Sequence, residues 1–249
     1  MTIANFTTRE MLRSNIFYGS LIISGLIVVI SLIASSLSYL EKSSVILDFG
    51  MGLNSLYSAF LAIYFGSGLL SNEIESRTLY CTLSRPIERS TFVIGKILGV
   101  VMPFTIIVTW AGLVTLLVYS ASDGNININH FYSIYGILLE SLTVFSISLF
   151  TSLFANKILS SLYTFIILIF GHGLSDLDNF KFIDGNIKLI LKGLKLLLPN
   201  ISLVNYKNYA VYHQSLSLSI VAQSSMHIIF YMIAIFCMTI FLFNKKDLD

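Results

Sequence analysis

Residues 71–99 read SNEIESRTLYCTLSRPIERSTFVIGKILG and form a charged stretch between two long apolar runs. Seven of the chain's 28 charged residues (15 basic and 13 acidic) lie in it: Glu73, Glu75, Arg77, Arg85, Glu88, Arg89 and Lys96. A plain connection within a membrane needs few charges, because charges are costly near the hydrocarbon. We therefore expect this loop to face the cytoplasm and to dock a soluble protein.

The remainder of the chain has the composition of a membrane protein. Of its 249 residues, 55% are hydrophobic and 11% are charged, whereas soluble domains average about 25% charged residues. Several apolar runs exceed the roughly 18 residues needed to span a bilayer. These runs are continuous, which excludes the alternating pattern of a transmembrane β-barrel. We predict one all-α membrane domain over residues 1–249.

Six transmembrane helices are predicted, at approximately residues 16–38, 49–70, 93–119, 131–155, 158–174 and 216–243. An interfacial helix should precede them, starting near Thr8 and capped by Thr7 together with Glu10. Pro103 lies inside the third span and should kink it.

The connection between the last two spans, 175–216, is long enough to be structured. Within it, residues 186–198 predict an amphipathic helix that lies in the interface or re-enters the membrane partway. Lys188, Lys192 and Lys195 share one face of this helix. They either attract anionic groups or snorkel to anchor the helix, and snorkelling is the favoured interpretation.

The distribution of basic residues predicts the orientation. Six spans place nine Lys and Arg residues on the side of the termini and six on the other, where five of the six lie in the one long connection. Short cytoplasmic loops carry the excess of basic residues, and long translocated segments count less. Both termini and the 71–99 loop are therefore expected in the cytoplasm.

Polar residues inside the spans allow two interpretations each. Gly50, Asn54, Ser58, Ala62 and Gly66 recur every four residues, which favours a helix-packing face, although Asn54 and Ser58 could instead line a substrate path. Glu140 is the one carboxylate well inside a predicted span. It is either a gating or proton-linked group or, as we favour, a hydrogen-bonded carboxyl that pins its helix to a neighbouring Ser, Thr or Tyr.

The chain offers little chemistry of its own. Its four histidines lack metal-ligand spacing, and it has no Gly-rich phosphate loop. Cys81 lies in the charged loop and Cys237 deep in the last apolar run, so we expect no disulfide between them. We therefore expect no bound metal, no cofactor and no catalytic residue. Two alternatives are an intramembrane hydrolase that uses Ser67, Glu140 and His227, and a membrane anchor or assembly protein.

The 71–99 stretch resembles the signature of ABC-2 type transporter permeases, most closely those grouped with multicopper-enzyme maturation systems. The matching positions are Glu73, Glu75, Arg77-Thr78-Leu79, Leu83-Ser84-Arg85-Pro86-Ile87, Arg89 and Gly95-Lys96. Residues 199–208, PNISLVNYKN, also resemble a segment that these permeases carry before their last span. Arg77 departs from the family, which often has Gly at that position.

The resemblance implies a permease subunit of an ATP-driven exporter, in the inner membrane of a bacterium. Two permeases pair, here as a homodimer, and each binds a separate ABC ATPase that holds ATP and Mg; no nucleic acid is involved. A coupling helix at 73–83, which Asn72 can cap, would enter the ATPase, and Pro86 would start the next helix. The implied contact residues are Glu73, Ile74, Glu75, Arg77, Thr78, Leu79, Arg85, Pro86 and Arg89.

The resemblance also places a path between the two permeases, along spans 2 and 5. Its candidate lining residues are Asn54 and Ser58 on span 2 and Ser160, Ser161, Tyr163 and Thr164 on span 5. The substrate is not indicated by any motif, and the direction of transport rests on the resemblance.

Overall fold

The computed structural model describes residues 2–37, 41–75, 88–173, 199–212 and 214–245, which are helical over most of their length. Its elements are α1 (Thr2–Arg13), α2 (Asn15–Ser36), α3 (Lys42–Glu75), α5 (Arg89–Ala121), α6 (Ile128–Thr151), α7 (Lys157–Gly173), the short 3₁₀ helix η2 (Ile201–Val204), α9 (Lys207–Val211) and α10 (Leu218–Lys245).

Five helices of the described residues are long and apolar enough to cross a membrane: α2, α3, α5, α6 and α10. The fifth predicted span corresponds to α7, which has 17 residues in the described part of the chain. At a rise of 1.5 Å per residue it reaches about 26 Å, slightly less than the ~30 Å hydrocarbon core. The count of six spans therefore remains a prediction.

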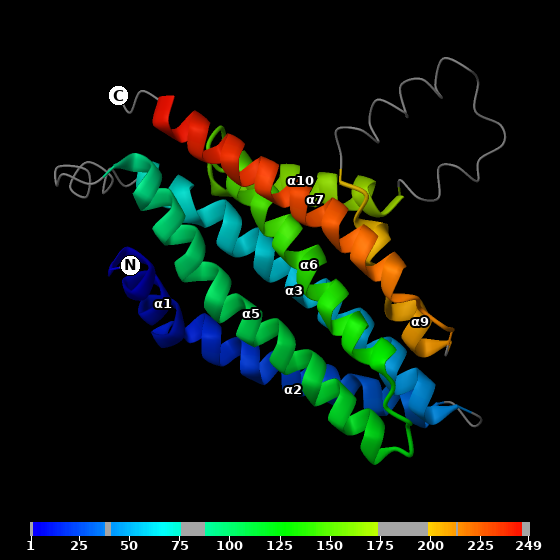
Figure 1. The fold of residues 1–249 in the computed structure, drawn as a ribbon. Helices are drawn as coiled ribbons and strands as arrows, with labels where there is room; N and C mark the ends of the chain where they lie inside the picture. Colours follow the sequence, from blue (N-terminus) through cyan, green and yellow to red (C-terminus); the bar gives the residue numbers. More distant parts are fainter. Residues whose placement is uncertain (1, 38–40, 76–87, 174–198, 213, 246–249) are drawn as a thin grey trace.

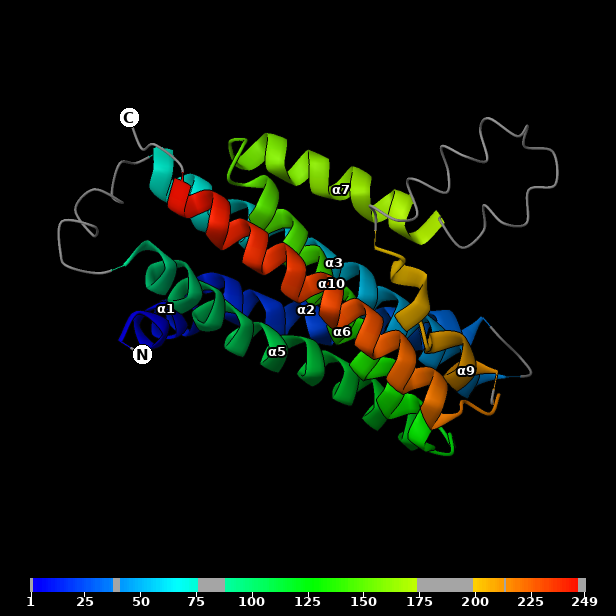
Figure 2. The same cartoon turned by 45° about the horizontal axis from the view of Figure 1, so that its top comes forward.

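The long helices form one bundle around α3 and α6 (Figures 1 and 2). The most apolar window of α6 is 78% buried inside the bundle, whereas those of α2 and α10 are only 22% and 17% buried. The outward faces of α2 and α10 are rich in Ile, Leu and Phe. In a bilayer these faces meet lipid, which is as apolar as they are.

Small residues let α3 approach its neighbours closely. A methyl group on Gly66 would lie 2.6 Å from Ser148 Cβ of α6, and one on Gly50 would overlap Thr115 of α5. Asn54, Ser58 and Ala62, between these glycines, are at most 1% exposed. The four-residue repeat is thus a helix-packing face, as predicted.

The prediction for the first helix was wrong in its start and its cap. Helix α1 begins at Thr2 rather than near Thr8, and the Thr7 hydroxyl donates to the Ile3 carbonyl 3.1 Å away, inside the helix. The reason is tertiary: α1 packs along α5, where a methyl group on Gly99 would lie 2.6 Å from Thr7 Cβ. Packing against α5 therefore stabilises the first turns, which the local capping pattern left out.

Helix α3 is longer than the predicted second span at both ends. It begins at Lys42 rather than Phe49 and continues without a break through Asn72 and Glu73 to Glu75. The prediction that Asn72 caps a separate helix with Glu73 in its first turn was therefore wrong, because no Gly or Pro interrupts residues 69–75. At 34 residues, α3 is a rod of about 51 Å.

Candidate functional site

The end of α3 and the start of α5 lie side by side and are joined by an ion pair. Lys96 Nζ of α5 is 2.5 Å from Glu73 Oε1 of α3, and the two side chains are 14% and 22% exposed. A carboxylate in the last turn of a helix is disfavoured by the helix dipole, and the nearby ammonium offsets this. The pair therefore fixes the spacing of the two helices on either side of residues 76–87.

The start of α5 is also tied to the last membrane helix. Arg89 Nη1 donates to the Asn244 carbonyl of α10 at 3.5 Å. Helix α5 begins at Arg89 in the described residues, with Glu88 at its cap position, and continues through Pro103 to Ala121. The prediction that this helix starts at Pro86 was wrong, because Glu88, just before the first helical residue Arg89, has an extended backbone; Pro86 itself lies outside the described residues. A displacement at the start of α5 would thus be transmitted to α3 through the Glu73–Lys96 ion pair and to α10 through Arg89.

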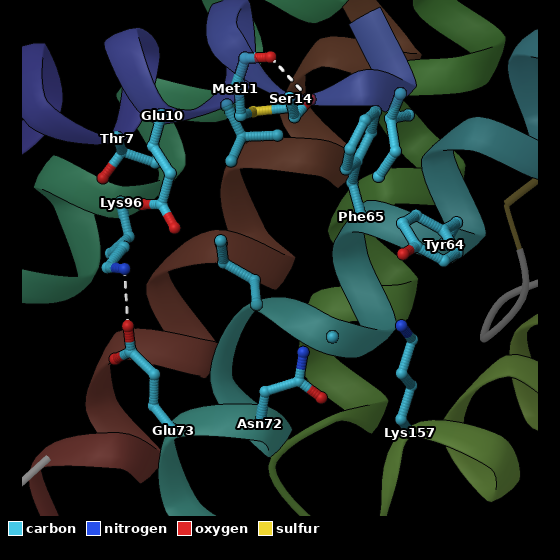
Figure 3. Close-up of a pocket in the computed structure, with 14 residues that line it drawn as sticks. Thr7, Glu10, Met11, Ser14, Tyr64, Phe65, Asn72, Glu73, Lys96 and Lys157 are labelled. Carbon is cyan, nitrogen blue, oxygen red and sulfur yellow. Dashed lines mark hydrogen bonds and ion pairs between the residues drawn. The ribbon is translucent and has the colours of Figure 1, made fainter. Parts of the chain in front are cut away.

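A cavity of about 320 Å³ opens at the same end of the bundle (Figure 3). It lies where α1, α3, α5 and the start of α7 meet, and its charged lining residues are Glu10, Glu73, Lys96 and Lys157. Lys157 Nζ lies 4.0 Å from the centroid of the Tyr64 ring, a cation–π contact between α7 and α3. The C-terminal part of α3 therefore contacts α5 through Glu73 and the start of α7 through Tyr64.

The predicted contact residues are only partly described by the structure. Glu73 and Ile74 lie in the last turn of α3, Glu75 ends that helix, and Arg89 begins α5. Ile74 is partly buried and packs against the core of the bundle, so its contacts are internal. The others lie outside the described residues: Arg77, Thr78, Leu79, Arg85 and Pro86. So do the rest of the predicted helix at 73–83 and the amphipathic helix at 186–198 with Lys188, Lys192 and Lys195.

Glu140 is held between three helices. Its side chain is buried on α6, and the Ser55 hydroxyl of α3 donates to its two oxygens at 3.2 and 3.1 Å. His172 Nε2 of α7 lies 3.1 Å from Glu140 Oε1. A Ser partner on a neighbouring helix is the arrangement favoured from the sequence. The His172 partner was missed, because two residues 32 positions apart on different helices share no sequence spacing.

The candidate path residues lie in contacts between helices of this chain. Asn54 is fully buried and its Nδ2 donates to the Val108 carbonyl of α5 at 3.4 Å, while the Ser58 hydroxyl donates to the Ser55 carbonyl. Ser161 of α7 donates to Ser67 Oγ of α3 at 3.1 Å, and Thr164 is buried against Thr151. Their role in a substrate path remains a prediction.

The three residues of the hydrolase alternative are not assembled. The Ser67 hydroxyl donates to the Tyr64 carbonyl and accepts from Ser161, and Glu140 is bound by Ser55 and His172. His227 is exposed on α10, in a separate cavity lined by η2 and α9 residues. Among the described residues, no cluster of three His, Cys, Asp or Glu side chains could hold a metal ion.

Comparison with known families identifies the chain. A family model described as ABC-2 family transporter protein matches residues 2–248, nearly its whole length. No curated protein matches the chain. The family match agrees with the resemblance at residues 71–99, while kinship with the multicopper-maturation type remains a prediction. Together with the five apolar helices, it shows that the chain belongs to the ABC-2 transporter family as a multi-pass membrane permease.

Proposed function

We propose that this permease is the membrane subunit of an ATP-driven exporter and that residues 76–87 receive the movement of a separate ABC ATPase. Two copies of the chain would form the transport unit, and both termini would lie in the cytoplasm of a bacterium. The family match supports an ATPase partner. The observation that carries the proposal is the unbroken α3 rod, which runs from the far end of the bundle directly into this segment.

The geometry at the base of the segment supports a transmitting role. A segment attached to two helix ends can move the rest of the membrane domain only if those ends are coupled to it. The Glu73–Lys96 ion pair joins α3 to α5, and Arg89 joins α5 to α10. A push on residues 76–87 would therefore tilt α3 and α5 together, and α3 packs along most of α6.

The charges of the described residues support the proposed orientation. Helix α1, the start of α5 and the end of α10 lie at the same end of the bundle (Figure 1), and basic residues are frequent in the segments at this end. They are Arg9, Arg13, Arg89, Lys96, Lys157 and Lys245. The opposite end has Lys42 and Lys207 beside Glu41, Asp48 and Asp123. By the positive-inside rule, the α1 end faces the cytoplasm.

The proposal is tested by isolating the permease with the ABC ATPase encoded beside it and measuring ATP hydrolysis in nanodiscs. We expect the two proteins to co-purify and the permease to change the rate of hydrolysis. Glu73→Lys should abolish this change, because it breaks the ion pair at the base of the segment, and the swap Glu73→Lys with Lys96→Glu should restore it.

The matched control is Glu41→Lys, the same change just before the opposite end of α3, which should leave hydrolysis as in the unmodified complex. Independent purification of the two proteins, or equal effects of the changes at Glu73 and Glu41, would contradict the proposal.

A further inference from the structure

Glu140 of α6 and His172 of α7 form an ion pair, and hydrogen bonds join this pair to two further elements, α3 and η2. The Glu140 side chain is 4% exposed, while the His172 ring, in the last turn of α7, is 36% exposed. Ser55 of α3 donates to both carboxylate oxygens, and Ser202 of η2 donates to the His172 carbonyl at 2.9 Å. The buried acid thus contacts a ring that is itself partly exposed.

Each ring nitrogen of His172 faces an oxygen atom. His172 Nε2 faces Glu140 Oε1 at 3.1 Å, and Nδ1 faces the Leu168 carbonyl at 3.2 Å. The Leu168 carbonyl can only accept, so Nδ1 carries a hydrogen, and an ionised Glu140 can also only accept, so Nε2 then carries the second hydrogen. A neutral imidazole has one N–H, whereas the imidazolium has two. The described contacts therefore fit a protonated His172 against an ionised Glu140.

The packing around the Glu140–His172 pair depends on the proton of His172. Without it, the buried carboxylate would keep the Ser55 hydrogen bond but lose its counter-charge, and a buried charge without a counter-charge is strongly disfavoured. Lys207 of α9 also acts electrostatically on the ring and repels its positive charge, so the carboxylate has to offset that repulsion. Ser55 of α3 faces the pair as a neutral hydroxyl, and the Ser202 hydroxyl of η2 bonds the backbone carbonyl of His172.

The same end of α7 holds η2 in place. A methyl group on Gly171 would lie 2.9 Å from Ile201 Cδ1 and 3.1 Å from the Pro199 carbonyl, so the two backbones are in close contact. Ile201 is 1% exposed beneath this contact. A loosening of the last turn of α7 would remove the contact that covers Ile201 on this side.

We propose that Glu140 and His172 form a proton-binding site within the membrane body, and that the bound proton holds η2 closed against α7. At low pH the pair is charged on both sides and the contact is tight. As the pH rises the proton leaves through His172, the last turn of α7 loosens, and Ile201 becomes accessible. All residues of the site belong to this one chain, so the proposal does not depend on the proposed ATPase coupling.

The test measures thiol labelling of the purified full chain in phosphatidylcholine nanodiscs. In a Cys81→Ser, Cys237→Ser background, Ile201→Cys reports opening. Leu203→Cys, an exposed position of the same 3₁₀ helix, corrects for the pH dependence of thiol reactivity. The ratio of the two rates should rise at least about tenfold between about pH 6 and pH 9, because hydrogen bonds to charged groups are the strong ones.

Two substitutions separate this site from other titrating groups. Glu140→Gln keeps the shape of the side chain but removes the charge, and should make the ratio independent of pH. His227→Gln, which changes an exposed histidine of α10, should leave the rise intact. A flat ratio in the parent chain, or an undiminished rise in the Glu140→Gln variant, would overturn the proposal.

A measurement on the unmodified chain decides the matter if the Glu140→Gln variant does not fold. Nitrogen-15 NMR of labelled histidines, with the His172 signal assigned by its loss in His172→Gln, reports both ring nitrogens. We expect two N–H groups on His172 at about pH 6 and one at about pH 9, near which a free histidine is neutral. A neutral ring at both values would refute the proton-binding site.

Discussion

Adding one methyl group at Gly66 should weaken the bundle measurably, because this glycine sets the spacing of α3 and α6. In Gly66→Ala the new carbon would lie 2.6 Å from Ser148 Cβ and 2.9 Å from the Phe145 carbonyl oxygen. Two carbons in contact ordinarily sit about 3.5–4.0 Å apart, so the helices must separate by roughly 1 Å. Overpacking of this kind costs about 1–3 kcal/mol.

The same helix supplies the control. Gly52→Ala adds the same methyl group where nothing lies within 4 Å. It should leave the free energy of unfolding unchanged or raise it by up to about 1 kcal/mol, because Ala favours helix over Gly. The two variants should therefore differ by about 1–4 kcal/mol in unfolding by sodium dodecyl sulfate from mixed micelles. Equal unfolding free energies would refute the packing that places α3 against α6.

Three further predictions address other contacts of the bundle. Gly99→Val should detach α1 from α5, because the valine side chain would overlap Thr7. Trypsin should then cleave after Arg9 or Arg13 faster than in the control Gly19→Val, where the new side chain enters open space. Ser55→Ala should lower the free energy of unfolding by about 1.5–3 kcal/mol, since it removes a donor to a charged group, whereas the exposed Ser36→Ala should change it little. In a double-mutant cycle of unfolding free energies, Glu73→Gln and Lys96→Met should show a favourable coupling of up to about 1 kcal/mol that shrinks with added salt.

The sequence predicts the elements whose signals are local. Continuous apolar runs identify the membrane helices, since a span must be long and nearly uncharged. The four-residue repeat from Gly50 to Gly66 predicts a packing face, because a helix places every fourth residue on one side. The charged stretch at 71–99 marks the connection that resembles the family, and the family match covers it.

Features that depend on contacts between distant helices could not be predicted. The start of α1 is set by its packing on Gly99 of α5, about ninety positions along the chain from Thr7 to Gly99. The continuity of α3 through Asn72 is favoured by the Lys96 ion pair, which a local capping pattern does not register. The pairing of Glu140 with His172 depends on how α6 and α7 fold back on one another.

The most direct test of the account is photocrosslinking from residue 79. A p-benzoylphenylalanine replacing Leu79, within the 76–87 segment, would be illuminated in intact cells that also make the neighbouring ABC ATPase. The account predicts a crosslink between the permease and the ATPase at Leu79, and none from the same probe at Asn125, an exposed residue in the connection between α5 and α6. A crosslink at Asn125, or no crosslink at Leu79 while the ATPase still co-purifies, would contradict the assignment of residues 76–87 as the docking segment.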